Sequence, residues 1–525
     1  MKHIQHIAIF AGLALTISSC KKDFLTLYPQ GSINEGTFYK TAADFQQALT
    51  GAYVPLREAA NIAFYLEEMR SDNTYYTYNP KDRGSVAYEQ LADFMDDKSN
   101  GGIGTLWTAG FNGIQRTDVI LDRIQAVTSG IPDSVRHQIT GEAKALRAHY
   151  YFELVRLFGK LPLYLHEVKD NSSAFVNRSS VDSIYMQIVS DFTDAIGLLS
   201  LPAFNTSGQQ SGHITRGMAA TELGLVYLTL KQYDKAATIL QTVTQMGYNL
   251  LPNYADVFNT ANENGRESIF EIDYKAGTDG VTTANPGGLS SPFIFRFIPG
   301  TPNTLAILGV AYNTSNANYG GWNVPTQDLI NTYEVGDKRL DASIAVVKGH
   351  LDNNQDYQPD SVTSVLSPAT PGEQSRNFTR KYFHLPYNLQ NNTDQDWYWY
   401  RYSDVLLMLA EALNEQGQSA AGLPYLNQVR ARAGLVASSE TNQAVLRDVI
   451  AHERRVELAF ENHRWFDLVR TGQAIPVMSA YGIKQKQLYS YLLPGSYNVV
   501  ESRLIYAVPF RETQVNPGLG QNTGY

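Results

Sequence analysis

Three long stretches of the chain carry apolar residues at helical spacing, and this periodicity limits the fold more than any other feature of the sequence. In each stretch apolar side chains recur every three or four residues, which places them along one face of a helix. The stretches span about 114–158, 180–247 and 402–471. In the first, Gly159 and Pro162 follow the last apolar residue, as expected where a helix ends. The sequence therefore predicts a mainly α-helical protein.

The second and third stretches each predict two helices joined by a short turn. In the second, Leu223 and Leu230 lie on one apolar face, a break follows, and Gly224 sits where two helices could approach closely. The third repeats this plan, and a further helix is expected over about 442–462. Both patterns resemble tetratricopeptide units. We expect a scaffold of such helix pairs over about 35–250 and 400–475.

Residues 250–400 differ in character from the rest of the chain. They are rich in Gly, Pro, Asn, Thr and aromatic residues, with short strand-like runs at 268–272 and 378–383. We interpret this part as a long, loop-rich, irregular insertion with a few short strands. Loops of such length inside a compact chain are usually functional. We therefore expect one domain over 20–525, in which the insertion, together with the loop at 70–100, binds a ligand.

The start of the chain has the pattern of a lipoprotein signal peptide. Lys2 precedes an apolar run over 7–17, which is too short to span a membrane, and Ser18-Ser19-Cys20 follows. This ending resembles a bacterial lipobox, so we expect residues 1–19 to be removed and Cys20 to carry the lipid. An ordinary secretory signal with a chance cysteine is the alternative. No later stretch reaches about 18 apolar residues, so we expect a tethered protein rather than one that spans the membrane.

The composition excludes several classes of function. The formal net charge is −9, and an acidic balance argues against nucleic acid as the main partner. Cys20 is the only cysteine, which excludes intrachain disulfides, cysteine-rich zinc sites and a cysteine nucleophile. The chain has 33 tyrosines, and Asn and Gln crowd its loops. Such a surface suits neutral, polyhydroxylated ligands better than charged ones.

The common catalytic motifs are missing from the sequence. It contains no HExxH, GxSxG, GxxxxGK[ST] or GxGxxG pattern, so we assign no catalytic residue, metal or cofactor. A site with two catalytic carboxylates is not excluded, because among 51 acidic residues some pair will always lie close together. Asp352, Asp356 and Asp360 allow a calcium loop, but the spacing lacks the alternate-residue ligands and the glycine of an EF-hand. A solvated turn is the favoured interpretation.

The segment 452–470 is the most densely charged part of the chain. Glu453, Glu457 and Glu461 recur at a spacing of four, as do His463 and Asp467. These residues could form an acid–base or metal site. We favour a structural salt-bridge network, because acids at this spacing usually find cationic partners. The expected partners are Arg454, Arg455, Arg464 and Arg470.

Aromatic and amide residues gather in three loop segments. A sugar presents apolar C–H faces and polar edges, so a ring can cover the face while Asn, Asp or Arg bonds the hydroxyls. Phe293, Phe295 and Phe297 alternate as in a strand and are expected to pack in the core, as is the run 397–400. The segments 72–79 and 312–322 are Asn-rich, and their rings fit a ligand site and a plug over the helical core equally well. Our candidate ligand-binding residues are Tyr75, Tyr76, Tyr78, Tyr319 and Trp322.

Several collinear segments resemble the SusD/RagB family of outer-membrane lipoproteins. The match includes the FL…PQG segment after Cys20, GEAKALRAHYY at 141–151, LFGKLP at 157–162, RYSDVLLMLAEA at 401–412, and the residues Glu453-Arg454-Arg455, Glu457, Glu461, Arg464-Trp465, Asp467 and Arg470. Together these segments span nearly the whole mature chain in order, which makes the resemblance specific.

The resemblance implies a function in nutrient capture. Members of this family are not enzymes; they sit on the cell surface as a hinged lid over a SusC-like TonB-dependent β-barrel transporter. They capture oligosaccharides, or in some members peptides, and deliver them to the barrel. The resemblance further implies that the charged segment 452–470 is a hallmark of the fold, and that loops of the irregular part contact the ligand. No ligand residue carries over by motif. Peptide capture, a surface glycoside hydrolase and a protein-docking scaffold are the competing hypotheses.

Overall fold

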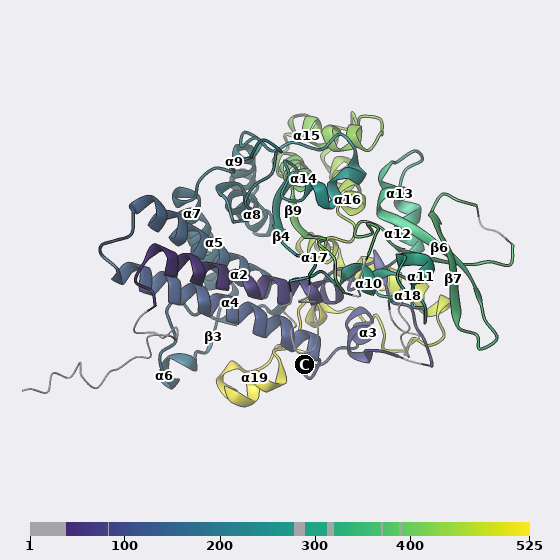
Figure 1. Ribbon diagram of the computed structural model, residues 1–525, viewed down its shortest axis with the longest axis horizontal. Helices are drawn as coiled ribbons and strands as arrows, with labels where there is room; N and C mark the ends of the chain where they lie inside the picture. Colours follow the sequence, from purple (N-terminus) through teal and green to yellow (C-terminus); the bar gives the residue numbers. More distant parts are fainter. Residues whose placement is uncertain (1–37, 82, 278–288, 312–319, 369–370, 388–390) are drawn as a thin grey trace, which may run out of the picture.

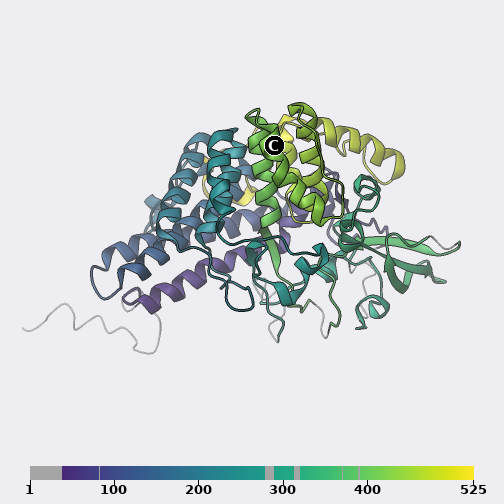
Figure 2. The same cartoon turned by 90° about the horizontal axis from the view of Figure 1, so that it is seen from above.

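The computed structural model describes residues 38–81, 83–277, 289–311, 320–368, 371–387 and 391–525. Helices dominate, as predicted, and they form one continuous body in Figures 1 and 2. The long helices are α2 (Ala42–Leu66), α4 (Gly101–Ala126), α5 (Asp133–Phe158), α7 (Val181–Leu198), α8 (Arg216–Thr229), α9 (Tyr233–Val243), α14 (Tyr402–Glu415), α15 (Ser419–Arg432), α16 (Gln443–Glu457) and α18 (Ala474–Leu488). Shorter ones are α3 (Val86–Ala92), α6 (Asn171–Ala174), α17 (Arg464–Arg470) and α19 (Phe510–Val515).

The expected helix pairs are present. The first apolar stretch forms α4 and α5, and the other two form α8 with α9 and α14 with α15, each pair packed together. Gly159 ends α5 with a positive φ of 71°, which a glycine adopts without strain. Gly224 lies at a close approach of α8 to α9, because a Cβ there would stand 2.5 Å from Leu240 side-chain atoms.

The irregular region between α9 and α14 is built from short elements. Its helices are α10 (Phe293–Phe297), α11 (Leu305–Leu308), α12 (Gln327–Thr332) and α13 (Arg339–Ser343), with the 3-10 turns η2 (Tyr254–Phe258) and η3 (Thr260–Asn262). Among the described residues the strands make four small antiparallel sheets. These pair β1 (Thr74–Tyr75) with β5 (Val324–Pro325), β2 (Leu161–Pro162) with β3 (Arg178–Ser179), β4 (Ser268–Ile272) with β9 (Trp397–Arg401), and β6 (Ile344–Leu351) with both β7 (Tyr357–Ser364) and β8 (Gln374–Thr379).

Three predictions of local structure were wrong. Phe293, Phe295 and Phe297 form a helical turn, not a strand; Phe293 and Phe297 face the main core while Phe295 faces a second cluster behind the β6–β7 hairpin. The helix expected over 442–462 ends at Glu457, and the chain beyond it turns through Phe460 and Asn462, which take positive φ values of 71° and 67°. The run at 378–383 is a strand only to Thr379. Helix α18 was not expected at all.

The scaffold and the irregular region share one hydrophobic core. Phe293, Tyr382 and Trp397 of the irregular region belong to the same buried cluster as the apolar faces of the long helices. The β6–β7 hairpin projects from this body at the right of Figures 1 and 2. Within the described residues, none of the helices combines the length and the hydropathy needed to cross a bilayer. The predicted signal peptide and Cys20 lie outside the described residues.

Candidate functional site

A two-residue ladder brings two of the predicted aromatic segments together. Strand β1 pairs with β5, so that Tyr75 lies opposite Val324. Beyond the ladder, the Thr77 amide donates to the Gly321 carbonyl at 2.7 Å, and the Trp322 amide donates to the Arg296 carbonyl at 3.0 Å. The segments 74–78 and 320–325, far apart in the sequence, therefore form one surface.

The rings on this surface form a connected aromatic chain. Trp322 lies at its centre, with ring centroids 5.2 Å from Tyr65, 5.9 Å from Tyr88 and 6.2 Å from Tyr76. Four further contacts extend the chain: Tyr76 to Tyr491 at 6.0 Å, Tyr78 stacked on Tyr491 at 4.0 Å, Tyr491 to Tyr489 at 5.5 Å, and Tyr489 to Tyr75 at 5.9 Å. We call these eight residues the aromatic cluster: Tyr65, Tyr75, Tyr76, Tyr78, Tyr88, Trp322, Tyr489 and Tyr491.

The candidate residues differ in exposure. Tyr75, Tyr78 and Trp322 are partly exposed, and the Tyr78 ring also packs between Tyr491 and the Arg83 guanidinium, which lies 4.8 Å from its centroid. Tyr76 is only 2% exposed, and its hydroxyl donates to Asp93 Oδ2 at 2.9 Å, so it supports the cluster from inside. Burial raises the pKa of Asp93 to about 7, although the Tyr76 hydrogen bond opposes the shift. Tyr319 lies outside the described residues.

Sequence reasoning missed half of the cluster. Tyr489 and Tyr491 come from the segment after α18, and both are partly exposed. Tyr65 and Tyr88 stack on each other at 3.8 Å behind Trp322. The alternation of tyrosines at 489 and 491 was a usable signal, but nothing in the sequence placed that segment beside residue 78.

A polar cavity of about 290 Å³ adjoins the cluster at Tyr78. The loop 77–81 forms one side, and Tyr357 and Arg376 of the hairpin sheet form another. The Arg376 guanidinium lies 3.9 Å from the Tyr357 ring centroid and donates to the Gly300 carbonyl at 3.0 Å. Lys81 Nζ is 2.9 Å from Asp356 Oδ1 at the mouth. Rings and hydrogen-bonding groups thus meet at one place, as in sites that bind sugars.

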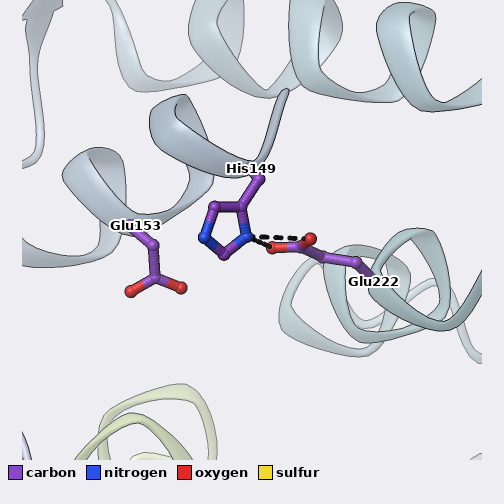
Figure 3. Close-up of side chains that lie close together, drawn as sticks. All are labelled: His149, Glu153 and Glu222. Carbon is purple, nitrogen blue, oxygen red and sulfur yellow. Dashed lines mark hydrogen bonds and ion pairs between the residues drawn. The ribbon is translucent and has the colours of Figure 1, made fainter. Parts of the chain in front are cut away.

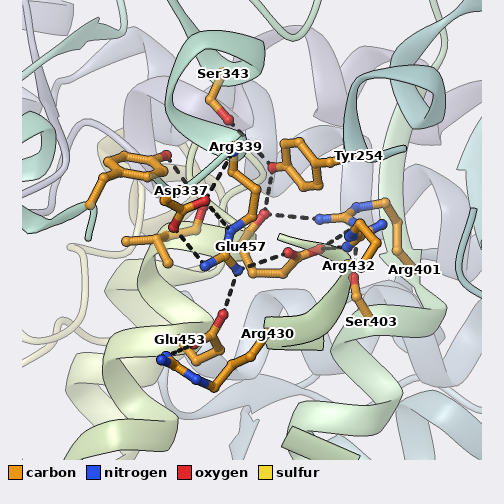
Figure 4. Close-up of polar contacts among 12 residues, drawn as sticks. Tyr254, Asp337, Arg339, Ser343, Arg401, Ser403, Arg430, Arg432, Glu453 and Glu457 are labelled. Atoms are coloured by element: carbon orange, nitrogen blue, oxygen red, sulfur yellow. Dashed lines mark hydrogen bonds and ion pairs between the residues drawn. The ribbon is translucent and has the colours of Figure 1, made fainter. Parts of the chain in front are cut away.

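The charged segment forms a structural network, as favoured from the sequence (Figure 4). Glu457 receives hydrogen bonds from Arg432 at 2.5 Å, Arg401 at 2.9 Å and Arg339 at 3.1 Å, all buried. Burial alone would raise the pKa of Glu457, but these cations outweigh it and hold the pKa well below its usual range. The expected partners were right for Asp467, which pairs with Arg454 and Arg470. They were wrong for the glutamates, because Arg454 and its neighbours otherwise bind acids outside the segment, namely Asp72, Asp328, Asp404 and Glu411.

Two groups of possible metal ligands have structural explanations. Asp352 caps the β6–β7 turn by accepting the amides of Asn354 and Asp356 at 2.8 and 3.0 Å, as the solvated-turn interpretation predicts. Elsewhere, donor atoms of His149, Glu153 and Glu222 lie within 4.8 Å of one another (Figure 3). His149 Nδ1 lies 2.9 Å from Glu222, and Glu153 is ion-paired with Arg156. We interpret this group as a buried ion pair that joins α5 to α8.

Comparison with known proteins identifies the family. A family model described as "SusD family" matches residues 232–525, more than half of the chain. The chain belongs to the SusD family. A second model, described as "Starch-binding associating with outer membrane", matches residues 23–228.

Curated relatives and solved structures agree over nearly the whole chain. "SusD-like protein P25" of Formosa agariphila is 25% identical over 99% of this chain and 99% of its own. A "SusD-like protein" of Bacteroides ovatus is 23% identical over 90% of this chain and 83% of its own. A solved structure named "Laminarin binding SusD-like protein" superposes with a TM-score of 0.73 and 27% identity, covering 93% of this chain and 100% of the other.

Proposed function

We propose that this SusD-family protein captures oligosaccharides at the outer surface of the outer membrane and delivers them to a SusC-like TonB-dependent transporter. The observation that carries the proposal is the partly exposed row of Tyr75, Tyr78 and Trp322 beside the polar cavity that Arg376 lines. The rings would cover sugar C–H faces, and the polar groups would bond the hydroxyls at the edges. The family membership and the laminarin-binding relative support this class of ligand.

Such a role needs a binding cleft and a tether but no catalytic group. A preformed cleft of modest affinity can release its cargo to a transporter. The tether would be a lipid on Cys20, which keeps the protein near the pore and raises its effective concentration there. We propose on the same grounds that the protein is not an enzyme and that it needs no cofactor.

Calorimetric titration of laminarihexaose into a soluble chain that begins at Lys21 tests the proposal. This chain keeps every described residue. We expect binding, and we expect Tyr78→Ala and Trp322→Ala to weaken it at least about tenfold, or ~1.4 kcal/mol, since each removes an aromatic side chain from the surface that would contact the sugar. Tyr227→Ala, at a partly exposed tyrosine of α8, is the matched control. Circular dichroism confirms that each variant is folded.

Other outcomes separate the competing hypotheses. A panel of further polysaccharides and a peptide mixture is titrated alongside laminarihexaose. Binding to peptides but to no glycan would assign the cleft to peptide capture. Glycan binding that neither substitution changes would place the ligand elsewhere on the molecule.

A further inference from the structure

A second cavity, of about 210 Å³, lies away from the aromatic cluster. It is formed by α2, the segment before α8 and strand β4, and it shares no lining residue with the cleft beside Tyr78. Its polar wall includes Tyr53, Arg57, His213, Glu271 and Asp273. Drug-sized ligands occupy about 300–1,000 Å³, so this cavity suits a smaller molecule.

Arg57 brings a guanidinium to this cavity. The side chain is half-buried on α2, and it forms no ion pair or hydrogen bond with any residue that the structure describes. By contrast, the buried arginines of the charged network each bind one or more carboxylates. Because the side chain is only half-buried, water solvates the guanidinium, and a ligand carboxylate can take the place of that water.

Glu271 lines the same cavity with a buried carboxyl group that is only partly hydrogen-bonded. It is 2% exposed; one carboxyl oxygen accepts the Asn264 amide at 3.1 Å, and the other oxygen is buried with no described partner. Asp273 lies nearby on the same wall, where Asn264 donates to one of its oxygens at 2.9 Å. Burial, together with the charges of Glu263 and Asp273, raises the pKa of Glu271 to about 8. At neutral pH this carboxyl therefore keeps its proton, and an ammonium placed beside it would favour the ionised form.

The rest of the lining is held in place. The Tyr53 hydroxyl donates to Glu142 at 2.6 Å and accepts the Ile214 amide at 2.9 Å, while His213 Nδ1 lies 2.9 Å from Glu142. Gly212 packs closely on Asp273, since a Cβ at this glycine would clash with Asp273 Oδ2 unless that carboxylate moved. Leu56, Phe270 and Ile272 contribute the apolar part. The cavity is thus preformed, with a cation, two carboxyls and an apolar floor.

We propose that this cavity binds a small zwitterion of the α-amino acid class, with the ligand carboxylate on Arg57 and the ligand ammonium at Glu271 and Asp273. A guanidinium and two carboxyls line one cavity, and no ion pair joins them among the described residues. One molecule that carries both charges can contact both sides, and its ammonium can reach the buried, unpaired oxygen of Glu271. A neutral sugar would gain no charge-assisted contact with Arg57 or Asp273, and a simple anion would be repelled by the Asp273 carboxylate. The site is independent of the proposed glycan cleft.

Calorimetric titration with L-leucine, L-phenylalanine and L-methionine at millimolar concentration tests this inference. We expect L-leucine to bind, because the floor of the cavity is apolar. Two fragments of it, 4-methylpentanoate without the ammonium and 3-methylbutylamine without the carboxylate, should bind at least about tenfold more weakly. Arg57→Gln and Asp273→Asn should each weaken L-leucine binding by a similar factor. Arg511→Gln, at an exposed arginine of α19, is the matched control and should leave it unchanged.

Several results would overturn the assignment. These are no binding of any of the three amino acids, equal binding of L-leucine and 4-methylpentanoate, or unchanged binding in the folded Arg57→Gln variant. Thermal stabilisation by calcium chloride but by no amino acid would show a cation site instead. Trp322→Ala should leave L-leucine binding intact, so failure here and failure of the glycan proposal are distinguishable.

Discussion

At the scale of single residues, buried charges in this protein are held by networks rather than by isolated pairs. Glu457 is fully buried and receives three arginines, and Arg401 among them also binds Glu267 and Glu461. Such a network compensates the cost of removing each charge from water only while all members are present. Removing one member therefore leaves several uncompensated cations.

We expect Glu457→Gln to lower the free energy of unfolding by about 3–5 kcal/mol, because it leaves buried arginines without a counter-charge. Glu415→Gln is the matched control, since Glu415 pairs with the half-exposed Arg447 and should cost about 1 kcal/mol or less. Urea denaturation followed by circular dichroism measures both. A loss for Glu457→Gln no larger than that for the control would contradict the network interpretation.

Asp93, beneath the aromatic cluster, should make stability depend on pH. Its carboxyl, which faces Tyr76, Glu89, Arg83 and Tyr497, holds its proton up to about pH 7 in the folded protein but only to about pH 4 when unfolded. The folded state therefore binds more protons in this range, and the contribution to stability is lost as the pH rises from about 4 toward 7.

The Asp93→Asn variant isolates this contribution. The stability of the wild type relative to Asp93→Asn should decrease between pH 4.5 and 7.5 in urea denaturation, about the range in which only the folded state holds the proton. Asp448→Asn, at an exposed carboxyl of α16, should show no such trend. Parallel pH profiles for wild type and Asp93→Asn would rule the effect out.

At the scale of elements, close helix packing depends on glycine at particular positions. At Gly224 a Cβ would stand 2.5 Å from Leu240, whereas at Gly197 in α7 nothing lies within 4 Å. We expect Gly224→Ala to destabilise the protein by about 1–3 kcal/mol through overpacking. Gly197→Ala should stabilise it by about 0.5–1 kcal/mol, because alanine favours the helix. Thermal unfolding of the two variants measures this, and equal effects of one sign would disprove the packing argument.

The helix pairs could be predicted from sequence because their signal is local. Leu223, Gly224 and Leu230 report a helix face through spacing alone, and α8 follows. The aromatic cluster depends on contacts between distant segments, so composition could suggest Tyr78 and Trp322 but could not place Tyr491 against Tyr78. The same limit explains why the glutamates of the charged segment were expected to pair with neighbouring arginines rather than with Arg339 and Arg401.

At the scale of the whole molecule, the irregular region is bound to the scaffold by continuous structure. Strand β9 runs directly into α14, and the Tyr402 amide donates to the Glu267 carbonyl at 2.8 Å beside β4. Arg401 at the end of β9 binds Glu457 and Glu461, which belong to the scaffold side. Since the buried cluster also spans both parts, the region over 250–400 should not unfold before the helices do.

Hydrogen exchange in rising urea, resolved by peptide, measures this coupling. We expect peptides from β4 and β9 to become exchange-competent at the same urea concentration as peptides from α14, because one global opening exposes all of them. The exposed turn of the β6–β7 hairpin, at 352–356, should exchange earlier and serves as the internal control. Earlier exchange of β4 and β9 than of α14 would show that the irregular region is a separate cooperative unit. In that case the chain would hold two domains. The polar cavity beside Tyr78 has walls from the loop 77–81 and from the irregular region, so it would open when the less stable domain unfolds.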